Sequence, residues 1–90
     1  MGYKALITLD LTSATEKQRE QFYEFLTNKK WTKIKTLTTA WKASFGDNVT
    51  RDSAIRILES ELLAAKTESK IYKVEYGLQL DMFEVVIKTI

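Results

Sequence analysis

The order of two hydrophobic periodicities is the feature of this 90-residue sequence that most limits its fold. Apolar residues recur at every second position, as in strands, in residues 3–11, 31–37, 39–45, 71–76 and 83–87. Helical periodicity runs through two further segments, residues 16–29 and 51–66. The resulting β-α-β-β-α-β-β order predicts an α+β fold. The predicted fold is a ferredoxin-like βαββαβ sandwich with an antiparallel sheet, two helices on one face and an extra C-terminal strand.

Local signals mark where the predicted elements begin and end. Thr15 with Gln18, or Ser13 with Glu16, fits a capping box, and Thr50 fits the N-cap of the second helix. We expect the hairpin to turn near residues 37–38 and Gly77 to close the fourth strand. The residues expected in the core are Phe22, Phe25, Leu26, Ala54, Ile57, Leu58, Leu62 and Ala65. Trp41 is expected in the core or at an interface. Tyr72, Tyr76 and Phe83 form either a dimer seam or a core-facing row, and we favour the core for most of them.

The length of the chain predicts one domain, residues 1–90, with a single core. A chain this short buries only about 60–65% of its unfolded surface, so self-association is a natural source of added stability. Helices on one side leave the other sheet face open. We expect that face to carry apolar residues and to serve as a binding platform or a homodimer interface.

The composition excludes several kinds of chemistry. The sequence contains no Cys and no His, so disulfides, thiolate nucleophiles, structural zinc and imidazole acid–base catalysis are ruled out. Its three glycines, at positions 2, 46 and 77, cannot form a Gly-rich phosphate loop. We also expect no membrane-spanning segment and no signal peptide, which makes the cytoplasm the expected compartment.

Positive charge is concentrated in one part of the sequence. Between Glu24 and Asp47 there are five lysines and no acid, so this segment carries a charge of +5. Because the net charge of the whole chain is +2, the remaining residues carry 2 − 5 = −3. With Trp31 and Trp41 among them, the lysines predict a nucleic-acid contact surface. The alternative is a solvated strand edge that discourages aggregation. These lysines are Lys29, Lys30, Lys33, Lys35 and Lys42.

Asp10, at the end of the first predicted strand, is the candidate metal ligand. A carboxylate held at a strand end suits a divalent cation such as Mg²⁺, and two copies related by a two-fold axis could share one ion. The alternative is that Asp10 bonds to its own turn at residues 12–13. The sequence offers no second acid that can be placed beside it.

The sequence resembles the SinR-like and CRISPR-adaptation small-subunit group of ferredoxin-like proteins. The resemblance rests on KALITLDL with Asp10, on Thr39-Ala40-Trp41 in the third strand, and on Ile71-Tyr72 after the second helix. It implies a homodimer whose sheets pack together or exchange C-terminal strands. For some members it also implies duplex binding or metal-dependent phosphodiester cleavage with Asp10 as a ligand. The chain departs from the pattern at Leu9, where the group commonly has Tyr, and it lacks a basic cluster after the fourth strand.

Two functional hypotheses follow from the sequence. The first is a homodimeric nucleic-acid-associated protein, in its stronger form an Mg²⁺-dependent endonuclease. The second is a dimerisation or protein-binding module without chemistry, in which the open sheet face and the last strand form the contact.

Overall fold

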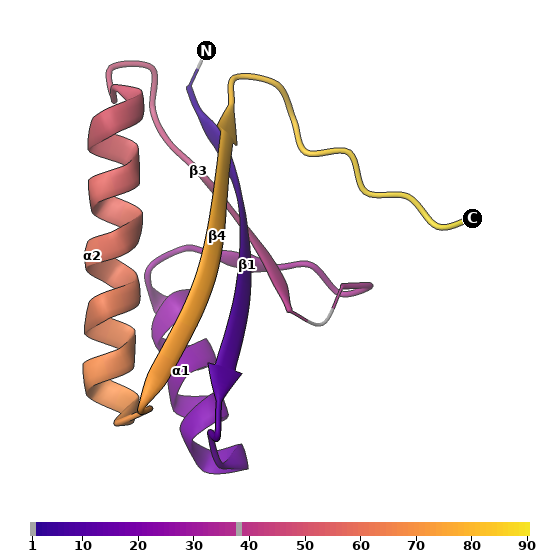
Figure 1. Cartoon of the computed structure of the whole chain (residues 1–90). Helices are drawn as coiled ribbons and strands as arrows, with labels where there is room; N and C mark the ends of the chain where they lie inside the picture. The colour runs from indigo at the N-terminus through magenta and orange to yellow at the C-terminus, as the bar shows by residue number, and fades with distance from the viewer. Residues whose placement is uncertain (1, 38) are drawn as a thin grey trace.

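The computed structural model describes residues 2–37 and 39–90, which form a four-stranded sheet with two helices (Figure 1). In chain order the elements are β1 (Lys4–Thr12), α1 (Glu16–Asn28), β2 (Thr32–Lys33), β3 (Ala40–Ser44), α2 (Arg51–Ser69) and β4 (Lys73–Asp81). None of the described helices is both long enough and apolar enough to cross a bilayer.

The sheet has the strand order β2-β3-β1-β4, with every neighbouring pair antiparallel. β1 lies at the centre and pairs with β4 along its whole length, from Lys4 opposite Asp81 to Thr12 opposite Lys73. Each helix connects two strands that have one other strand between them, which is the split βαβ arrangement. The predicted ferredoxin-like topology is therefore confirmed for four strands.

The core lies between the helices and one face of the sheet. Along β1 the odd-numbered residues Ala5, Ile7, Leu9 and Leu11 are buried, whereas Thr8 and Asp10, on the other face, are exposed. α1 contributes Phe22 and Leu26 to the same cluster, α2 contributes Leu58, Leu62 and Ala65, and β3 contributes Trp41. Both helices thus cover the face that carries the odd-numbered residues of β1, as the strand and helix periodicities of the sequence predict.

Both predicted N-caps are present. The Thr15 hydroxyl accepts a hydrogen bond from the Gln18 amide at 3.2 Å, and the Gln18 side chain accepts one from the Thr15 amide at 2.9 Å. The Gln18 side-chain nitrogen also donates to the Lys70 carbonyl, so the capping box ties the start of α1 to the end of α2. At the start of α2, the Thr50 hydroxyl accepts a hydrogen bond from the Ser53 amide.

Replacing this cap should measurably weaken the fold. We expect Thr15→Ala to lower the free energy of unfolding by about 1 kcal/mol, because it leaves a helix N-terminal amide without its acceptor. Urea unfolding followed by circular dichroism measures the change. Thr27→Ala is the matched control, since the Thr27 hydroxyl only donates to the Tyr23 carbonyl within α1. Equal losses in both variants would contradict a specific capping role.

The predicted strand at residues 31–37 is mostly wrong, because only Thr32 and Lys33 pair with β3. The chain then turns: the Leu37 amide donates to the Ile34 carbonyl at 3.1 Å, and the Ala40 amide donates to Leu37 at 3.0 Å. Burial of Ile34 anchors this turn. The predicted hairpin turn includes residue 38, which lies outside the described residues.

The fourth strand is longer than predicted, because it continues through Gly77 to Asp81 instead of ending at Gly77. Gly77 pairs with Thr8 on the open face, and a Cβ at this position would lie 3.1 Å from the Thr8 hydroxyl. On the helix side, Leu78 and Leu80 pack against the core and extend the apolar alternation. A glycine here accommodates a close neighbour within the strand rather than ending it.

The extra C-terminal strand predicted at residues 83–87 is absent: in the structure residues 82–90 form neither helix nor strand. The chain leaves the sheet because the Asp81 carboxylate accepts hydrogen bonds from the amides of Met82 at 2.7 Å and Phe83 at 3.4 Å. This side-chain turn ends the pairing of β4 with β1. We call residues 82–90 the C-terminal segment.

Candidate functional site

The open face of the sheet is polar, so the prediction of an apolar open face is wrong. Its central strand presents Lys4, Leu6, Thr8, Asp10 and Thr12, and of these only Leu6 is apolar. The flanking strands present mostly polar residues on this face, namely Lys42 and Ser44 from β3, and Lys73, Glu75, Gly77, Gln79 and Asp81 from β4. Covering this face with a second sheet would therefore bury little apolar surface and contribute little hydrophobic stabilisation.

Asp10 lies exposed on this face, directly opposite Glu75 of β4. Glu75 is the second acid that the sequence reasoning missed, because the register between β1 and β4 decides which residues meet. With Thr8 and Gly77 the two carboxylates border a shallow hollow of about 320 Å³. Glu75 also forms an ion pair with Lys73 at 3.5 Å. Among the described residues no group of three or more Asp, Glu, His or Cys could hold a metal ion, so the Mg²⁺ site stays a prediction.

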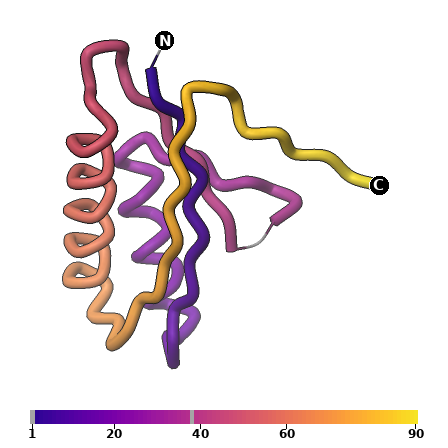
Figure 2. The backbone as a smooth tube through the Cα atoms, turned by 45° about the horizontal axis from the view of Figure 1, so that its top comes forward, coloured from indigo at the N-terminus to yellow at the C-terminus, as the bar shows by residue number. Residues whose placement is uncertain are grey.

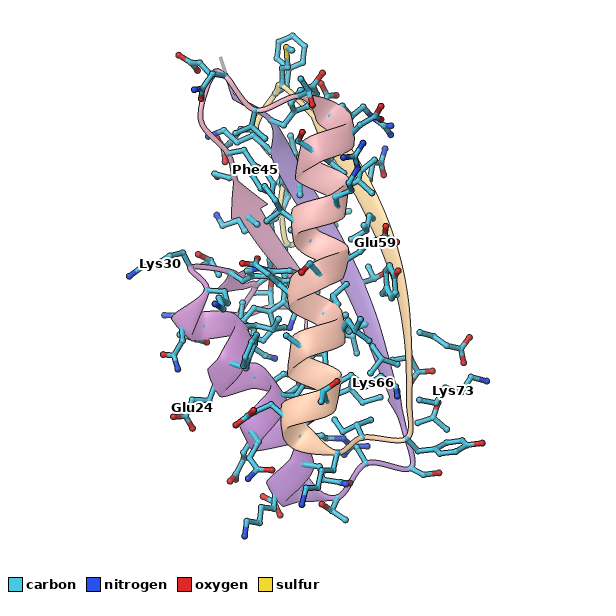
Figure 3. The ribbon with its side chains drawn as sticks, turned by 90° about the vertical axis from the view of Figure 1, so that its left-hand side faces the viewer. Glu24, Lys30, Phe45, Glu59, Lys66 and Lys73 are labelled. Carbon is cyan, nitrogen blue, oxygen red and sulfur yellow. The ribbon has the colours of Figure 1, made fainter. Side chains whose placement is uncertain are left out.

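The five lysines of the basic segment surround the short edge strand β2. Lys29 and Lys30 follow the end of α1, where Figure 3 shows Lys30 pointing outward, and Lys35 follows β2. Lys42 lies on the open face opposite Thr32, whereas Lys33 lies opposite Trp41 on the helix side. The lysines thus form a charged edge that borders both sheet faces, not one flat patch.

Two of these lysines contact aromatic rings instead of projecting freely. The Lys33 ammonium lies 5.3 Å from the centre of the Tyr23 ring and 6.0 Å from that of Trp41. The Lys29 ammonium lies 5.5 Å from the centre of the Phe25 ring. Such cation–π contacts stabilise the local packing. Trp41 itself is only 1% exposed, which confirms the prediction that it is a core residue and leaves it inaccessible to a stacking base.

Apolar side chains are exposed in a different place, in and near the C-terminal segment. Phe83 is 71% exposed and Val86 is 76% exposed, and Met82, Ile87 and Ile90 are exposed as well. The favoured core position is therefore wrong for Phe83, and also for Tyr72, which is 84% exposed just before β4, whereas the dimer-seam alternative stays a prediction. A run of uncovered apolar residues on so small a domain is a candidate interaction site.

The C-terminal segment leaves the sheet on its open side and runs away from α2 (Figures 1 and 2). Its Glu84 carboxylate lies 3.8 Å from the ammonium of Lys4, which belongs to the open-face row of β1. The segment therefore crosses toward β1 and does not return along the outer edge of β4.

A side-chain hydrogen bond joins the outer edge of β4 to α2. The Tyr76 hydroxyl donates a hydrogen bond to the Glu59 carboxylate at 2.5 Å. This bond raises the pKa of Tyr76 above its usual value, and partial burial and the negative charge of Glu59 act in the same direction. The phenol accordingly stays neutral through the physiological range and remains a donor there. Tyr76 is 43% exposed, so the expectation of a core position is wrong for it too.

Comparison with known proteins supports the fold and carries no function. No protein-family model and no curated protein matches the sequence. The structure is similar to the crystal structure of protein SP2199 from Streptococcus pneumoniae, with a TM-score of 0.56 and 17% sequence identity over 94% of this chain and 90% of that chain. The likeness covers nearly the whole domain, and the resemblance to the SinR-like group stays a prediction.

Proposed function

We propose that the protein is a homodimeric assembly module in which the C-terminal segment joins two copies. The observation that carries the proposal is the exposure of this segment: Phe83, Val86 and Ile90 are exposed, and none of its residues belongs to the described core cluster. Burying one Leu, Ile, Val or Phe side chain contributes about 1.5–3 kcal/mol. A few such residues, contributed twice in a two-fold dimer, would supply the free energy of a stable association.

Analytical ultracentrifugation over a concentration series tests this proposal. We expect a reversible shift from the mass of one chain at low concentration to twice that mass at high concentration. A single species with the mass of one chain at every concentration would refute the homodimer. Larger, open-ended assemblies would contradict closed two-fold symmetry.

Nucleic-acid binding at the lysine edge around β2 is the second candidate function. It is favoured by the absence of acidic residues between Glu24 and Asp47 and by the exposure of Lys30 and Lys35. Cations on both sides of a strand edge suit contact with backbone phosphates, which carry no sequence information. In its stronger form this function adds Mg²⁺-dependent cleavage at Asp10, with Glu75 as the second carboxylate.

Charge reversal at this edge should weaken binding to any duplex. For Lys30→Glu combined with Lys35→Glu we expect a loss of affinity that does not depend on sequence, and a drop of about 2 in the slope of log affinity against log salt. Lys33 is left intact because it contacts two aromatic rings. Fluorescence anisotropy with a labelled duplex measures both effects.

The matched control for this experiment is Lys17→Glu combined with Lys73→Glu. These residues lie in the first turn of α1 and at the start of β4, away from β2, and the control makes the same change in net charge. Equal losses in the two double variants would show only a net-charge effect. Absence of binding by the unmodified chain at low salt would remove this second candidate altogether.

A further inference from the structure

A hollow of about 220 Å³ lies where β1 extends beyond β3. Pairing between these two strands ends at Thr8 opposite Ala40, with one further hydrogen bond from the Leu9 amide to the Thr39 carbonyl at 2.9 Å. The last part of β1 continues past the start of β3, beside α1 (Figure 1). We call this hollow the notch. It is lined by Leu9, Asp10, Leu11, Arg19, Tyr23 and Thr39.

The notch exposes peptide groups of β1. Along an antiparallel strand, every second residue directs its N–H and its C=O toward the same neighbouring strand. The Leu9 amide bonds to Thr39 on the β3 side, so the peptide groups of Leu11 point to that side as well. No residue of β3 pairs with Leu11 in the described part of the chain. A hydrogen-bond donor and an acceptor of the main chain therefore face the notch.

Two opposite charges border the notch, Asp10 from β1 and Arg19 from α1. Both side chains are exposed, and neither takes part in an ion pair with another described residue. A ligand that carries both charges can therefore bind between them. The planar guanidinium of an arginine binds a carboxylate through two N–H groups, and a carboxylate such as that of Asp10 accepts hydrogen bonds from an ammonium.

The other walls of the notch are apolar. Leu9 is 6% exposed and Leu11 is 7% exposed, so both belong to the core and reach the notch only with their outer atoms. The Tyr23 ring is held in place by the Trp41 ring, at 5.5 Å between centres, and by the Lys33 ammonium, at 5.3 Å from the centre of the Tyr23 ring. Small-molecule sites commonly combine apolar walls with a few polar groups that fix the orientation of the ligand.

We infer that the notch binds a free α-amino acid with an apolar side chain. The Arg19 guanidinium binds its carboxylate, the Asp10 carboxylate binds its ammonium, and its side chain lies against Leu9, Leu11 and Tyr23. The volume of about 220 Å³ is below the roughly 300–1,000 Å³ of pockets for drug-sized ligands, which suits a molecule this small.

This inference adds ligand binding to the proposed assembly module and does not depend on the dimer. None of residues 82–90 is among the residues that line the notch. A monomeric chain would therefore contradict the proposed function and leave this inference in place.

Titration of the isotope-labelled full chain with L-leucine, followed by NMR, tests the site. We expect saturable shifts concentrated in the amides of residues 9–11, 19, 23 and 39. Two analogues keep the side chain and remove one charge each, since leucinamide lacks the carboxylate and isocaproic acid lacks the ammonium. Each analogue should bind at least about tenfold more weakly than L-leucine, because one charged hydrogen-bonded contact is lost.

Two variants assign each charge of the ligand to its partner. Arg19→Gln should weaken L-leucine binding at least about tenfold but leave leucinamide binding unchanged, because leucinamide has no carboxylate for the guanidinium. Asp10→Asn should weaken L-leucine binding to the same extent and leave isocaproate binding unchanged. Arg56→Gln is the matched control, since Arg56 is exposed on α2 and does not line the notch. Circular dichroism checks that each variant is folded.

Each outcome supports or overturns the amino-acid site. Saturable shifts at the notch, together with the separate loss of each charged contact, would support it. Absence of shifts at millimolar L-leucine, or shifts centred elsewhere in the chain, would overturn it. Equal binding of L-leucine and both analogues would mean that only apolar surface is contacted, and equal losses in Arg19→Gln and Arg56→Gln would reveal a mere net-charge effect. Both results would refute the inference without requiring any variant of the C-terminal segment.

Discussion

Removing residues 82–90 is expected to convert a dimer into a folded monomer. The cut after Asp81 takes away the exposed apolar residues of the C-terminal segment and keeps all of β4. Within one chain the segment adds little stability, since it contributes no residue to the described core cluster and its ion pair with Lys4 lies at the surface, where such pairs contribute about 0–1 kcal/mol. Light scattering measures the mass, and urea unfolding measures the remaining stability.

A control variant separates the apolar row from the ion pair. Glu84→Gln removes the contact with Lys4 but keeps Phe83, Val85 and Ile87, so it should remain dimeric. A truncated chain that stays dimeric would place the contact elsewhere. A cut after Gly77 would be a poorer test, because it also removes four of the nine residue pairs that join β4 to β1.

Leu58→Ala should have the largest effect on the fold. Leu58 is fully buried, and removing its side chain leaves a cavity between α2 and the sheet. The expected loss is about 2–5 kcal/mol, a large part of the roughly 5–15 kcal/mol that stabilises a typical domain. Thermal unfolding should show a midpoint lower by at least about 10 °C.

The same substitution on the exposed side of the helix provides the control. Leu63→Ala, measured at a concentration at which the chain is monomeric, should change the free energy of unfolding by no more than about 0.5 kcal/mol, since Leu63 is mostly exposed. Similar losses of unfolding free energy in Leu58→Ala and Leu63→Ala would mean that α2 does not place Leu58 in the core and Leu63 at the surface.

Local chemistry explains the parts of the fold that the sequence predicted well. The capping box at Thr15 depends on residues three apart, and the alternation along β1 depends on one strand, so both are visible in the sequence. Ile57 was expected in the core but is 40% exposed, because the buried stripe of α2 is narrower than its apolar composition suggests.

Features that depend on contacts between distant segments were missed. Glu75 meets Asp10 only through the register of β4 on β1, which no local pattern specifies. Similarly, Gly77 looked like a strand end, although its neighbour Thr8 determines its role. The C-terminal segment has the composition of a strand but no partner strand among the described residues of its own chain, so its pattern predicts pairing without specifying the partner molecule.

Hydrogen–deuterium exchange in residues 82–90, measured at low and at high protein concentration, tests the central claim most directly. If the segment pairs with a second copy, its amides should exchange rapidly in dilute protein and at least about tenfold more slowly in concentrated protein, as the dimer forms. Rapid exchange at every concentration, or protection that does not change with concentration, would contradict joining of two copies through this segment.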